Sequence, residues 1–277
     1  MMAGAGRSRL CIRRAGIPVA AEAYENLICP STKKKRLDQV LVERGLAPSR
    51  SQAADLVRRG CVSVNGGPAA KPGAMVASGA DLAVAADASP YVSRGGLKLA
   101  AALEAFGLDP TYRVALDLGA STGGFTDVLL ARGAARIYAV DVGRGQLHPR
   151  IAAASRVVTL EGTDARHLDQ ASIPEEVGAI VADVSFISLT QALPAALRLA
   201  APGAWLVALV KPQFEAGREA VGKGGVVRDQ ADRDRALARV RDFIGEQKGW
   251  TVLGEIASPI RGGSGNEEFL LAARRDG

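Results

Sequence analysis

A lysine ends one of the most apolar stretches of the chain. Lys211 follows the run LVALV (206–210) and precedes Pro212. An unbroken run of this kind is typical of a strand buried on both faces of a parallel sheet, and proline ends such a strand because it has no N–H to donate. Lys211 is therefore either a lysine whose stem covers apolar surface while its head stays in water, or a lysine in a cleft of low dielectric constant, where a lowered pKa makes it useful as a base.

Three further charged residues are expected near the same place. Asp183 ends the strand expected over 178–183, Lys98 lies in the first turn of the helix expected before the sheet, and Glu268 opens the last expected strand. Parallel strands end at one edge of a sheet, where ligands bind, and an antiparallel last strand would begin at that edge. The four charges could serve proton transfer in one cleft. They could also form a buried salt-bridge network that only holds the strand ends together.

A glycine-rich turn follows the first expected strand, in the sequence VALDLGASTGGFTDVLL (114–130). Gly119, Gly123 and Gly124 allow the chain to turn tightly and to bring backbone N–H groups close to a bound anion. The spacing GxxxGG differs from the dinucleotide fingerprint GxGxxG and from the phosphate loop GxxxxGK(S/T). The turn indicates nucleotide binding, but nucleotide-binding folds of several classes use such a turn.

Acidic residues follow the next two strands. Asp141 ends the strand expected over 136–141, 24 residues after Asp117, and a carboxylate there can accept hydrogen bonds from both ribose hydroxyls of an adenosine ligand. Asp164, in GTDARHL (162–168), follows the third strand, where an adenine amino group could be met. The alternative is that these acids are capping or surface carboxylates.

Short apolar runs alternate with helical patterns from Val114 onward. We expect strands over 113–118, 136–141, 157–160, 178–183, 204–210, 251–257 and 268–273. Strands separated by helices form βαβ units with a parallel sheet. The expected fold is therefore a doubly wound α/β domain, Rossmann-like and seven-stranded, preceded by a smaller α+β module.

The excess positive charge lies at the start of the chain. Residues 1–60 contain 12 Lys or Arg and 5 Asp or Glu, whereas residues 61–277 contain 23 and 24, so the first fifth accounts for the whole net charge of +6. Such an asymmetry indicates a basic arm or module that binds a polyanion, with nucleic acid ahead of membrane. The alternative is a solvated cationic face that improves solubility.

Residues 33–66 indicate a small unit of two helices and a hairpin. Leu37, Val40 and Leu41 share one helical face before Gly45, and Asn65-Gly66 is a strong hairpin signal. Burial of the apolar residues leaves the cations on the surface, where they suit phosphate contacts. The cations of this unit that we expect to bind RNA are Lys33, Lys34, Lys35, Arg36, Arg50, Arg58 and Arg59.

The stretch RLDQVLVERGLAPSRSQAADLVRRGCVSVNG (36–66) resembles the small RNA-binding domain named after the fourth small-subunit ribosomal protein. The resemblance implies binding to structured RNA. Because this module has no aromatic residue, we expect recognition of shape and phosphates rather than base stacking. A hinge is expected near 86–92, and residues 1–31 are expected to be a poorly ordered extension.

Composition argues against several other classes of protein. No apolar run is long enough for a membrane-spanning helix, and the Arg-rich start is not followed by the apolar stretch of a secretory signal. Three cysteines without CxxC spacing and two histidines argue against a zinc site or a disulfide framework. We therefore expect no metal, no membrane partner and a cytoplasmic location.

Most of the chain resembles the hemolysin A (TlyA) family, from residue 33 to about residue 274. The motifs that carry the resemblance are SRGGLKL (93–99), LDLGASTGGFTD (116–127), DVGRGQL (141–147), ADVSFISL (182–189), VKPQFE (210–215), GKGGVVRD (222–229) and GNEEFLL (265–271). The resemblance implies an RNA-binding domain over 32–88 joined to an FtsJ-like class I methyltransferase domain over 89–277. It implies S-adenosylmethionine-dependent (cytidine-2′-O)-methylation of 16S rRNA, 23S rRNA or both in ribosomal subunits.

The resemblance also implies roles for the candidate residues. Lys211 would be the base, which requires its neutral form, while Lys98 and Asp183 would orient the reacting groups and Glu268 would add a further charge. Glu267 is the less favoured neighbour, because the family pattern GNxE selects Glu268 and strand alternation turns Glu267 to the other face. The residues implied in binding S-adenosylmethionine are Asp117, Gly119, Ser121, Gly123, Gly124, Phe125, Asp141, Asp164 and Asp183.

Two further segments bear on the substrate. The sequence Asp183-Val184-Ser185-Phe186 lacks the (D/N)PP(Y/F) arrangement linked to methylation of exocyclic amines, which favours an oxygen acceptor. The glycine-rich segment 216–229 is expected to be a mobile loop over the cleft, whose cations Arg218, Lys223 and Arg228 bind RNA phosphates. An ordinary surface loop is the alternative.

Two other functions compete with methyl transfer. One is that of a membrane-active hemolysin or cytolysin, as the older family name suggests, although we find no apolar span or lytic amphipathic helix. The other is that of a non-catalytic RNA-binding factor in ribosome assembly that keeps the fold and binds no cofactor.

Overall fold

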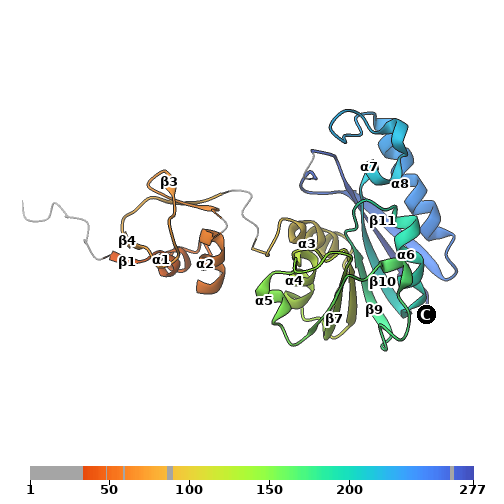
Figure 1. The fold of residues 1–277 in the computed structure, drawn as a ribbon, viewed down its shortest axis with the longest axis horizontal. Coiled ribbons are helices and arrows are strands. Elements are labelled where there is room, and N and C mark those ends of the chain that lie inside the picture. The colour runs from red at the N-terminus through yellow and green to blue at the C-terminus, as the bar shows by residue number, and fades with distance from the viewer. Residues whose placement is uncertain (1–33, 48, 59, 86–89, 263–264) are drawn as a thin grey trace, which may run out of the picture. The chain divides into compact units, whose positions relative to one another are not determined.

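The computed structural model of the chain describes residues 34–47, 49–58, 60–85, 90–262 and 265–277 (Figure 1). These residues form two compact units, one ending at Ala85 and one following it. The expected extension over 1–31, the cations Lys33 and Arg59, and residues 86–89 of the expected hinge lie outside the described residues.

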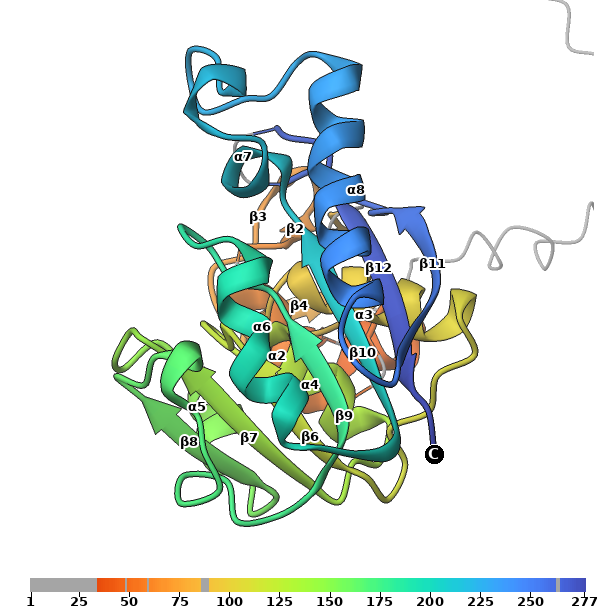
Figure 2. The same cartoon turned by 90° about the vertical axis from the view of Figure 1, so that its right-hand side faces the viewer.

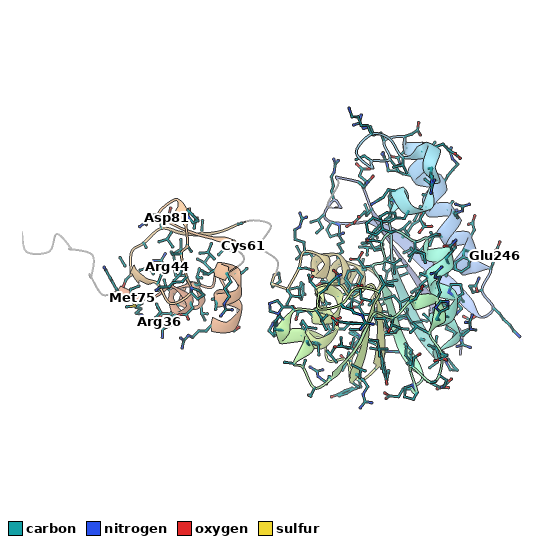
Figure 3. The ribbon with its side chains drawn as sticks, in the orientation of Figure 1. Arg36, Arg44, Cys61, Met75, Asp81 and Glu246 are labelled. Carbon is teal, nitrogen blue, oxygen red and sulfur yellow. The ribbon has the colours of Figure 1, made fainter. Side chains whose placement is uncertain are left out.

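The small unit combines two helices with short strands. Leu37, Val40 and Leu41 are buried on one face of the first helix, as their spacing predicts, and Gly45 follows that helix with a φ of 70°. Figure 3 draws the side chains as sticks and labels Arg36 and Arg44 of this unit, both of which are exposed. Its elements are β1 (Lys34–Arg36), α1 (Leu37–Glu43), α2 (Arg50–Arg58), β2 (Val62–Val64), β3 (Gly67–Pro68), β4 (Met75–Ala77) and β5 (Leu82–Val84).

The expected hairpin is present in the small unit. Asn65 and Gly66 have φ values of 51° and 78° and join the antiparallel strands β2 and β3. Two successive left-handed residues form the turn whose twist matches the twist of the strands on either side. The hairpin belongs to a three-stranded sheet in the order β3-β2-β5, and β1 pairs separately with β4.

The large unit is a seven-stranded sheet in the order β11-β12-β10-β9-β6-β7-β8. Its strands are parallel except β12, which runs antiparallel to β10 and β11. The strands are β6 (Val114–Leu118), β7 (Arg136–Asp141), β8 (Val157–Glu161), β9 (Val177–Ala182), β10 (Ala200–Val210), β11 (Trp250–Ala257) and β12 (Phe269–Arg275). The helices are α3 (Gly95–Ala105), α4 (Gly124–Ala131), α5 (Pro149–Ala152), α6 (Leu189–Arg198), α7 (Pro212–Glu215) and α8 (Gln230–Gly245), with 3-10 turns at Ala165–His167 and Arg218–Ala220.

Helices cover both faces of this sheet, which explains the unbroken apolar run of β10. Figure 2 shows α6 and α8 on one side of the sheet and α3 and α4 on the other. Leu206, Ala208 and Val210 pack in the core under α6 and α8, whereas Val207 and Leu209 pack in the core under α3 and α4. The run therefore needs no polar position until the strand ends at Lys211.

The fold class predicted from the sequence is confirmed, and β10 shows the largest difference in strand bounds. The expected strand began at 204, directly after Pro202 and Gly203, which are residues that usually break strands. The observed strand starts at Ala200, which pairs with Val177, and the register with β9 shifts before Trp205. This irregularity accommodates the proline and the glycine without ending the strand.

Candidate functional site

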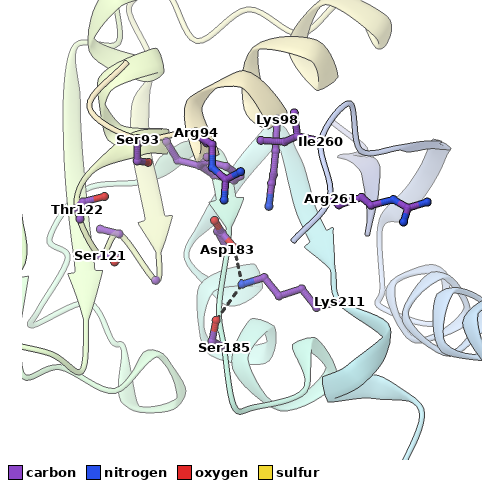
Figure 4. A pocket seen from close by; sticks show the side chains of 15 residues that line it. Ser93, Arg94, Lys98, Ser121, Thr122, Asp183, Ser185, Lys211, Ile260 and Arg261 are labelled. Carbon is purple, nitrogen blue, oxygen red and sulfur yellow. Dashed lines mark hydrogen bonds and ion pairs between the residues drawn. The ribbon is translucent and has the colours of Figure 1, made fainter. Parts of the chain in front are cut away.

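A cavity of about 300 Å³ lies where the central strands end, and three of the four residues expected to be catalytic line it (Figure 4). Lys98, Asp183 and Lys211 line it, together with residues of the glycine-rich turn. Lys98 and Lys211 are only 8% and 9% exposed. Burial of two lysines is costly unless each has a partner, so their neighbours decide what the cavity can do.

Lys211 is held by two groups from the end of β9. Its Nζ lies 2.6 Å from Asp183 Oδ1 and donates a hydrogen bond of 2.9 Å to Ser185 Oγ. The parallel pairing of β9 with β10, which aligns Ala182 with Ala208, brings these residues together just beyond the strand ends. The amine is thereby fixed at the cavity wall.

Lys98 is paired with Glu268 across a different part of the fold. Its Nζ donates a hydrogen bond of 2.5 Å to Glu268 Oε2, and both side chains are buried. Glu268 immediately precedes β12, so the antiparallel direction of this strand brings its start to the edge where the parallel strands end. The neighbouring Glu267 is half exposed and pairs with Arg261 and Arg233 instead.

The glycine-rich turn depends on the absence of a side chain at Gly119. This residue has a φ of +79°, and a Cβ on it would lie 2.7 Å from the carbonyl oxygen of Asp183. A larger residue would therefore both strain the turn and push away the end of β9. Gly123 also has a positive φ and precedes α4, while Gly124 and Phe125 line the cavity beside Lys98.

A second, larger cavity of about 570 Å³ adjoins the first. Gly119, Ser121, Asp183 and Ser185 line both cavities. Asp141 lies on the wall of the larger one, where its carboxylate accepts hydrogen bonds from the backbone N–H groups of Ser121 at 2.8 Å and Gly143 at 2.7 Å. The carboxylates of Asp141 and Asp164 on the wall of the larger cavity can accept hydrogen bonds from the hydroxyl and amino groups of an adenosine ligand.

Asp164 lines the same larger cavity and is fully ionised at neutral pH. Hydrogen bonds from the Arg166 side chain and backbone lower the pKa of Asp164 to about 2. The carboxylate also caps the 3-10 turn Ala165–His167. Its acceptor positions are therefore partly used within its own loop.

Asp117 differs from the other acids because it lines neither cavity. It is fully buried in β6, where Oδ2 accepts a hydrogen bond of 2.6 Å from Thr126 Oγ1. Burial raises the pKa of Asp117 to about 7, against the opposing effect of Thr126, and the nearby Asp183 raises it further. Its other oxygen has no hydrogen-bond partner among the described residues.

Several side chains at the site were not singled out from the sequence. Ser185, which binds Lys211, and Phe186 both lie in the motif from which only Asp183 was selected. Arg94 and Arg261 line the smaller cavity and are exposed (Figure 4). An arginine beside a glycine in a loop carries no periodic signal, so only the three-dimensional arrangement identifies these residues.

Glu215 is a buried acid that joins two segments of the site. It ends α7, which follows Lys211, and its carboxylate accepts hydrogen bonds from Ser188 Oγ at 2.5 Å and from the Leu189 N–H at 2.8 Å. Burial raises the pKa of Glu215, while these donors oppose the shift. Through this carboxylate the segment after Lys211 is fixed to the first turn of α6.

The expected RNA-binding cations within the described residues are exposed, but they are not equivalent. Lys34 and Arg58 lie on the surface of the small unit. Arg36 and Arg50 approach the buried Asp38 at 2.7 and 3.5 Å, and the Arg36 hydrogen bond in particular lowers the pKa of Asp38. The remaining cations are Lys35, which pairs with Glu43, and Arg218, Lys223 and Arg228, which are exposed in the large unit.

Comparison with known proteins identifies relatives over both units. The profile of FtsJ-like methyltransferases matches residues 91–275, and that of the S4 domain matches residues 35–82. A protein of Mycobacterium tuberculosis named 16S/23S rRNA (cytidine-2′-O)-methyltransferase TlyA is 48% identical over 243 residues, which cover 87% of this chain and 90% of the relative. Hemolysin A of Brachyspira hyodysenteriae is 39% identical over 236 residues, covering 85% and 98% of the two chains.

A solved structure is also similar. A protein of Streptococcus thermophilus classed with the hemolysins is 40% identical and superimposes with a TM-score of 0.66, covering 89% of this chain and 90% of the other. Within the residues described here, no helix combines the length and apolar character needed to cross a membrane. In the same part of the chain, no three His, Cys, Asp or Glu side chains are grouped as metal ligands would be.

The raised pKa of Asp117 predicts a pH-dependent stability. Between its unfolded value of 3.8 and its folded value of about 7, the folded chain keeps a proton on Asp117 that the unfolded chain has lost, so the contribution of Asp117 to the free energy of unfolding falls as pH rises. Asp117→Asn cannot ionise. The free energy of unfolding of the wild type minus that of the variant, both measured by urea unfolding, should fall by up to about 4 kcal/mol from pH 4 to pH 7. A difference independent of pH would contradict the assignment.

Proposed function

Because the chain belongs to the FtsJ-like methyltransferase family, and matches TlyA proteins over most of its length, we propose that it is an S-adenosylmethionine-dependent rRNA (cytidine-2′-O)-methyltransferase. Its substrate would be 16S rRNA, 23S rRNA or both, within ribosomal subunits in the cytoplasm. The observation that carries this proposal is the pairing of Lys211 with Asp183 and Ser185 at the wall of a cavity that adjoins a nucleotide-sized one.

The adjoining cavities fit the proposed cofactor. Asp141 and Asp164 would hold the adenosine part, and the turn at Gly119 and Ser121 would let the backbone approach the remainder of the molecule. Gly123 and Phe125 would shape the start of α4 around it, with Asp117 supporting the turn from beneath. Bound there, S-adenosylmethionine would supply a methyl group activated by its sulfonium.

Lys211 is the proposed base for the acceptor hydroxyl. In its neutral form its amine would take the proton of the ribose 2′-hydroxyl as the oxygen attacks the methyl carbon. Asp183 would stabilise the ammonium that forms, and Ser185 would keep Nζ in position. Lys98, paired with Glu268, would orient the acceptor from the opposite wall of the cavity.

A third cavity, of about 560 Å³, offers a place for the acceptor base. Phe186 and Phe214 line it, with ring centroids 5.3 Å apart, and the Phe214 ring centroid lies 6.0 Å from Lys211 Nζ. Phe186 is 91% exposed and has a φ of 65°, an unfavourable conformation for a bulky residue. The exposed ring of Phe186, which contacts Phe214 near Lys211, supports stacking on an unpaired nucleobase.

The small unit would recruit the RNA. We assign residues 32–88 to RNA binding and 89–277 to methyl transfer, in agreement with the S4 and FtsJ-like matches over 35–82 and 91–275. The exposed cations of the small unit would contact phosphates of structured rRNA, and Arg218, Lys223 and Arg228 would contact phosphates near the acceptor.

The direct test of this function is methyl transfer by the purified chain. With labelled S-adenosylmethionine and ribosomal subunits that lack the modification, we expect label in rRNA and 2′-O-methylcytidine after nuclease digestion. Label on a base, or no transfer to either subunit or to its free rRNA, would refute the proposal.

Replacing the proposed base should abolish chemistry but not binding. Lys211→Ala should lower the single-turnover rate by about 10²- to 10⁴-fold, the usual contribution of a general base, with the Kd values for cofactor and RNA nearly unchanged. Lys248→Ala, which removes an exposed lysine, is the matched control and should keep the wild-type rate. Near-full activity of Lys211→Ala would return Lys211 to a structural role.

Loss of the exposed aromatic ring should weaken RNA binding at the acceptor. Since stacking of one base contributes about 1–3 kcal/mol, Phe186→Ala should raise the KM for RNA by about 10-fold or more, and Phe186→Tyr should restore it. Tyr112→Ala is the control, because Tyr112 is also an exposed aromatic residue with a positive φ, 89% exposed, but precedes β6 at the opposite edge of the sheet. Equal effects of the two alanine variants would argue against stacking at Phe186.

Cations of the small unit should differ in what they contribute. Lys34→Ala and Arg58→Ala should weaken RNA binding and each lower the dependence of log Kd on log salt concentration by up to about 1, without a change in melting temperature. Arg36→Ala should also lower the melting temperature, because it leaves the buried Asp38 with a weaker partner. Filter binding at several salt concentrations, with thermal unfolding alongside, measures both effects.

A further inference from the structure

The glycine-rich segment 222–229, called the strap from here on, is seated by one buried side chain. The amide oxygen of Asn266 accepts a hydrogen bond of 2.9 Å from the Val227 N–H, and its amide nitrogen donates one of 2.8 Å to the Gly225 carbonyl. Asn266 is 1% exposed and Val227 is buried as well. Although the sequence suggested a loose loop, the middle of the strap is thus bound through backbone groups on either side of Val226.

Asn266 lies two residues before Glu268, the partner of Lys98. The Gly262 N–H donates a hydrogen bond of 2.9 Å to the Asn266 carbonyl, which ties Gly262 to the segment Asn266–Glu268, called the anchor segment from here on. A Cβ on Gly262 would lie 2.2 Å from Glu268 Oε1. The carboxylate of Glu268 therefore packs directly against a position where only a hydrogen atom fits.

The three residues of the anchor segment hold three different parts of the large unit. Asn266 binds the strap, Glu267 pairs with Arg233 of α8 at 3.3 Å, and Glu268 binds Lys98 of α3. Arg233 in turn donates hydrogen bonds to the carbonyls of Val227 and Arg228 at the end of the strap. A displacement of the anchor segment would consequently move the strap and the carboxylate of Glu268 together.

We propose that Gly262 and Asn266 are positioning residues that hold Glu268 against Lys98, and that Asn266 ties this pair to the strap. Lys223 and Arg228 of the strap are exposed to solvent. An RNA backbone bound by these two cations would therefore be connected through Asn266 to the Lys98–Glu268 pair. This inference rests on the proposed methyl transfer to rRNA. Neither residue touches the reacting atoms, and both act through Glu268.

Gly262→Ala should displace the carboxylate of Glu268 while leaving its charge in place. The described backbone of Gly262 needs no positive φ, and the obstacle to a methyl group is the flexible end of the Glu268 side chain, so the variant should fold. We expect a kcat about 10- to 100-fold lower, the effect of misplacing an orienting group by about 1 Å, with unchanged affinity for S-adenosylmethionine. Gly245→Ala, at a glycine with open space around it and no positive φ, is the matched control and should keep the wild-type kcat.

A double-mutant cycle separates positioning from general structural damage. If Gly262 acts through Glu268, Gly262→Ala should lower kcat in the wild-type background and have no further effect in a Glu268→Ala background. An equal loss in both backgrounds would overturn the proposal, as would wild-type kcat in Gly262→Ala.

Asn266→Ala tests the link to the strap and serves if Gly262→Ala does not fold. It should lower kcat, raise the KM for RNA, and speed hydrogen exchange of the Val227 amide, with Gln170→Ala, at an exposed amide, as control. Faster exchange with unchanged kcat and KM would overturn the link.

A wild-type protein that transfers no methyl group to rRNA would refute the proposed function itself. A fully active wild type with fully active variants would refute only this inference.

Discussion

The contact between Lys211 and Asp183 is the interaction on which the rest of the site depends. These residues are distant in sequence but adjacent in space because β9 and β10 are parallel neighbours whose carboxyl ends lie at the same edge of the sheet. A lysine that ends a strand buried on both faces has few ways to reach water, so it requires a carboxylate partner. The sheet thus creates both the demand for a buried pair and the geometry that satisfies it.

The same constraint explains why the site contains two ion pairs rather than a cluster of four equivalent charges. Lys211 pairs with Asp183 across the central strands, whereas Lys98 pairs with Glu268 between a helix and the antiparallel strand. Each lysine is anchored from a different direction, so the cavity wall between them is preorganised. The anchor segment before β12 completes this arrangement, because it must hold the carboxylate of Glu268 without a solvent shell to support it.

Much of this architecture was predictable because it follows from local patterns. The buried run before Lys211, the glycines after β6 and the Asn65-Gly66 hairpin each encode a backbone requirement in a few residues, and the structure contains all three elements. The placement of Asp183, Lys211 and Glu268 at one edge of the sheet also followed, since topology alone places these strand ends there, whereas Lys98 reaches the same edge from helix α3. Which lysine binds which carboxylate was not predictable, because that choice depends on side-chain reach across the cavity. Nor could sequence show that Asp117 lies beneath the cavities, that Ser185 binds Lys211, or that Asn266 holds the strap.

The central claim is that the acceptor hydroxyl lies at Lys211, and the most direct measurement is a structure of the chain bound to S-adenosylhomocysteine and a substrate RNA. The account predicts a cytidine whose 2′-oxygen lies within hydrogen-bond distance of Lys211 Nζ, about 2.6–3.2 Å, on the side of the cavity that faces the bound sulfur. A bound nucleotide that presents its base rather than its ribose to Lys211, or that lies in a cavity Lys211 does not reach, would contradict it.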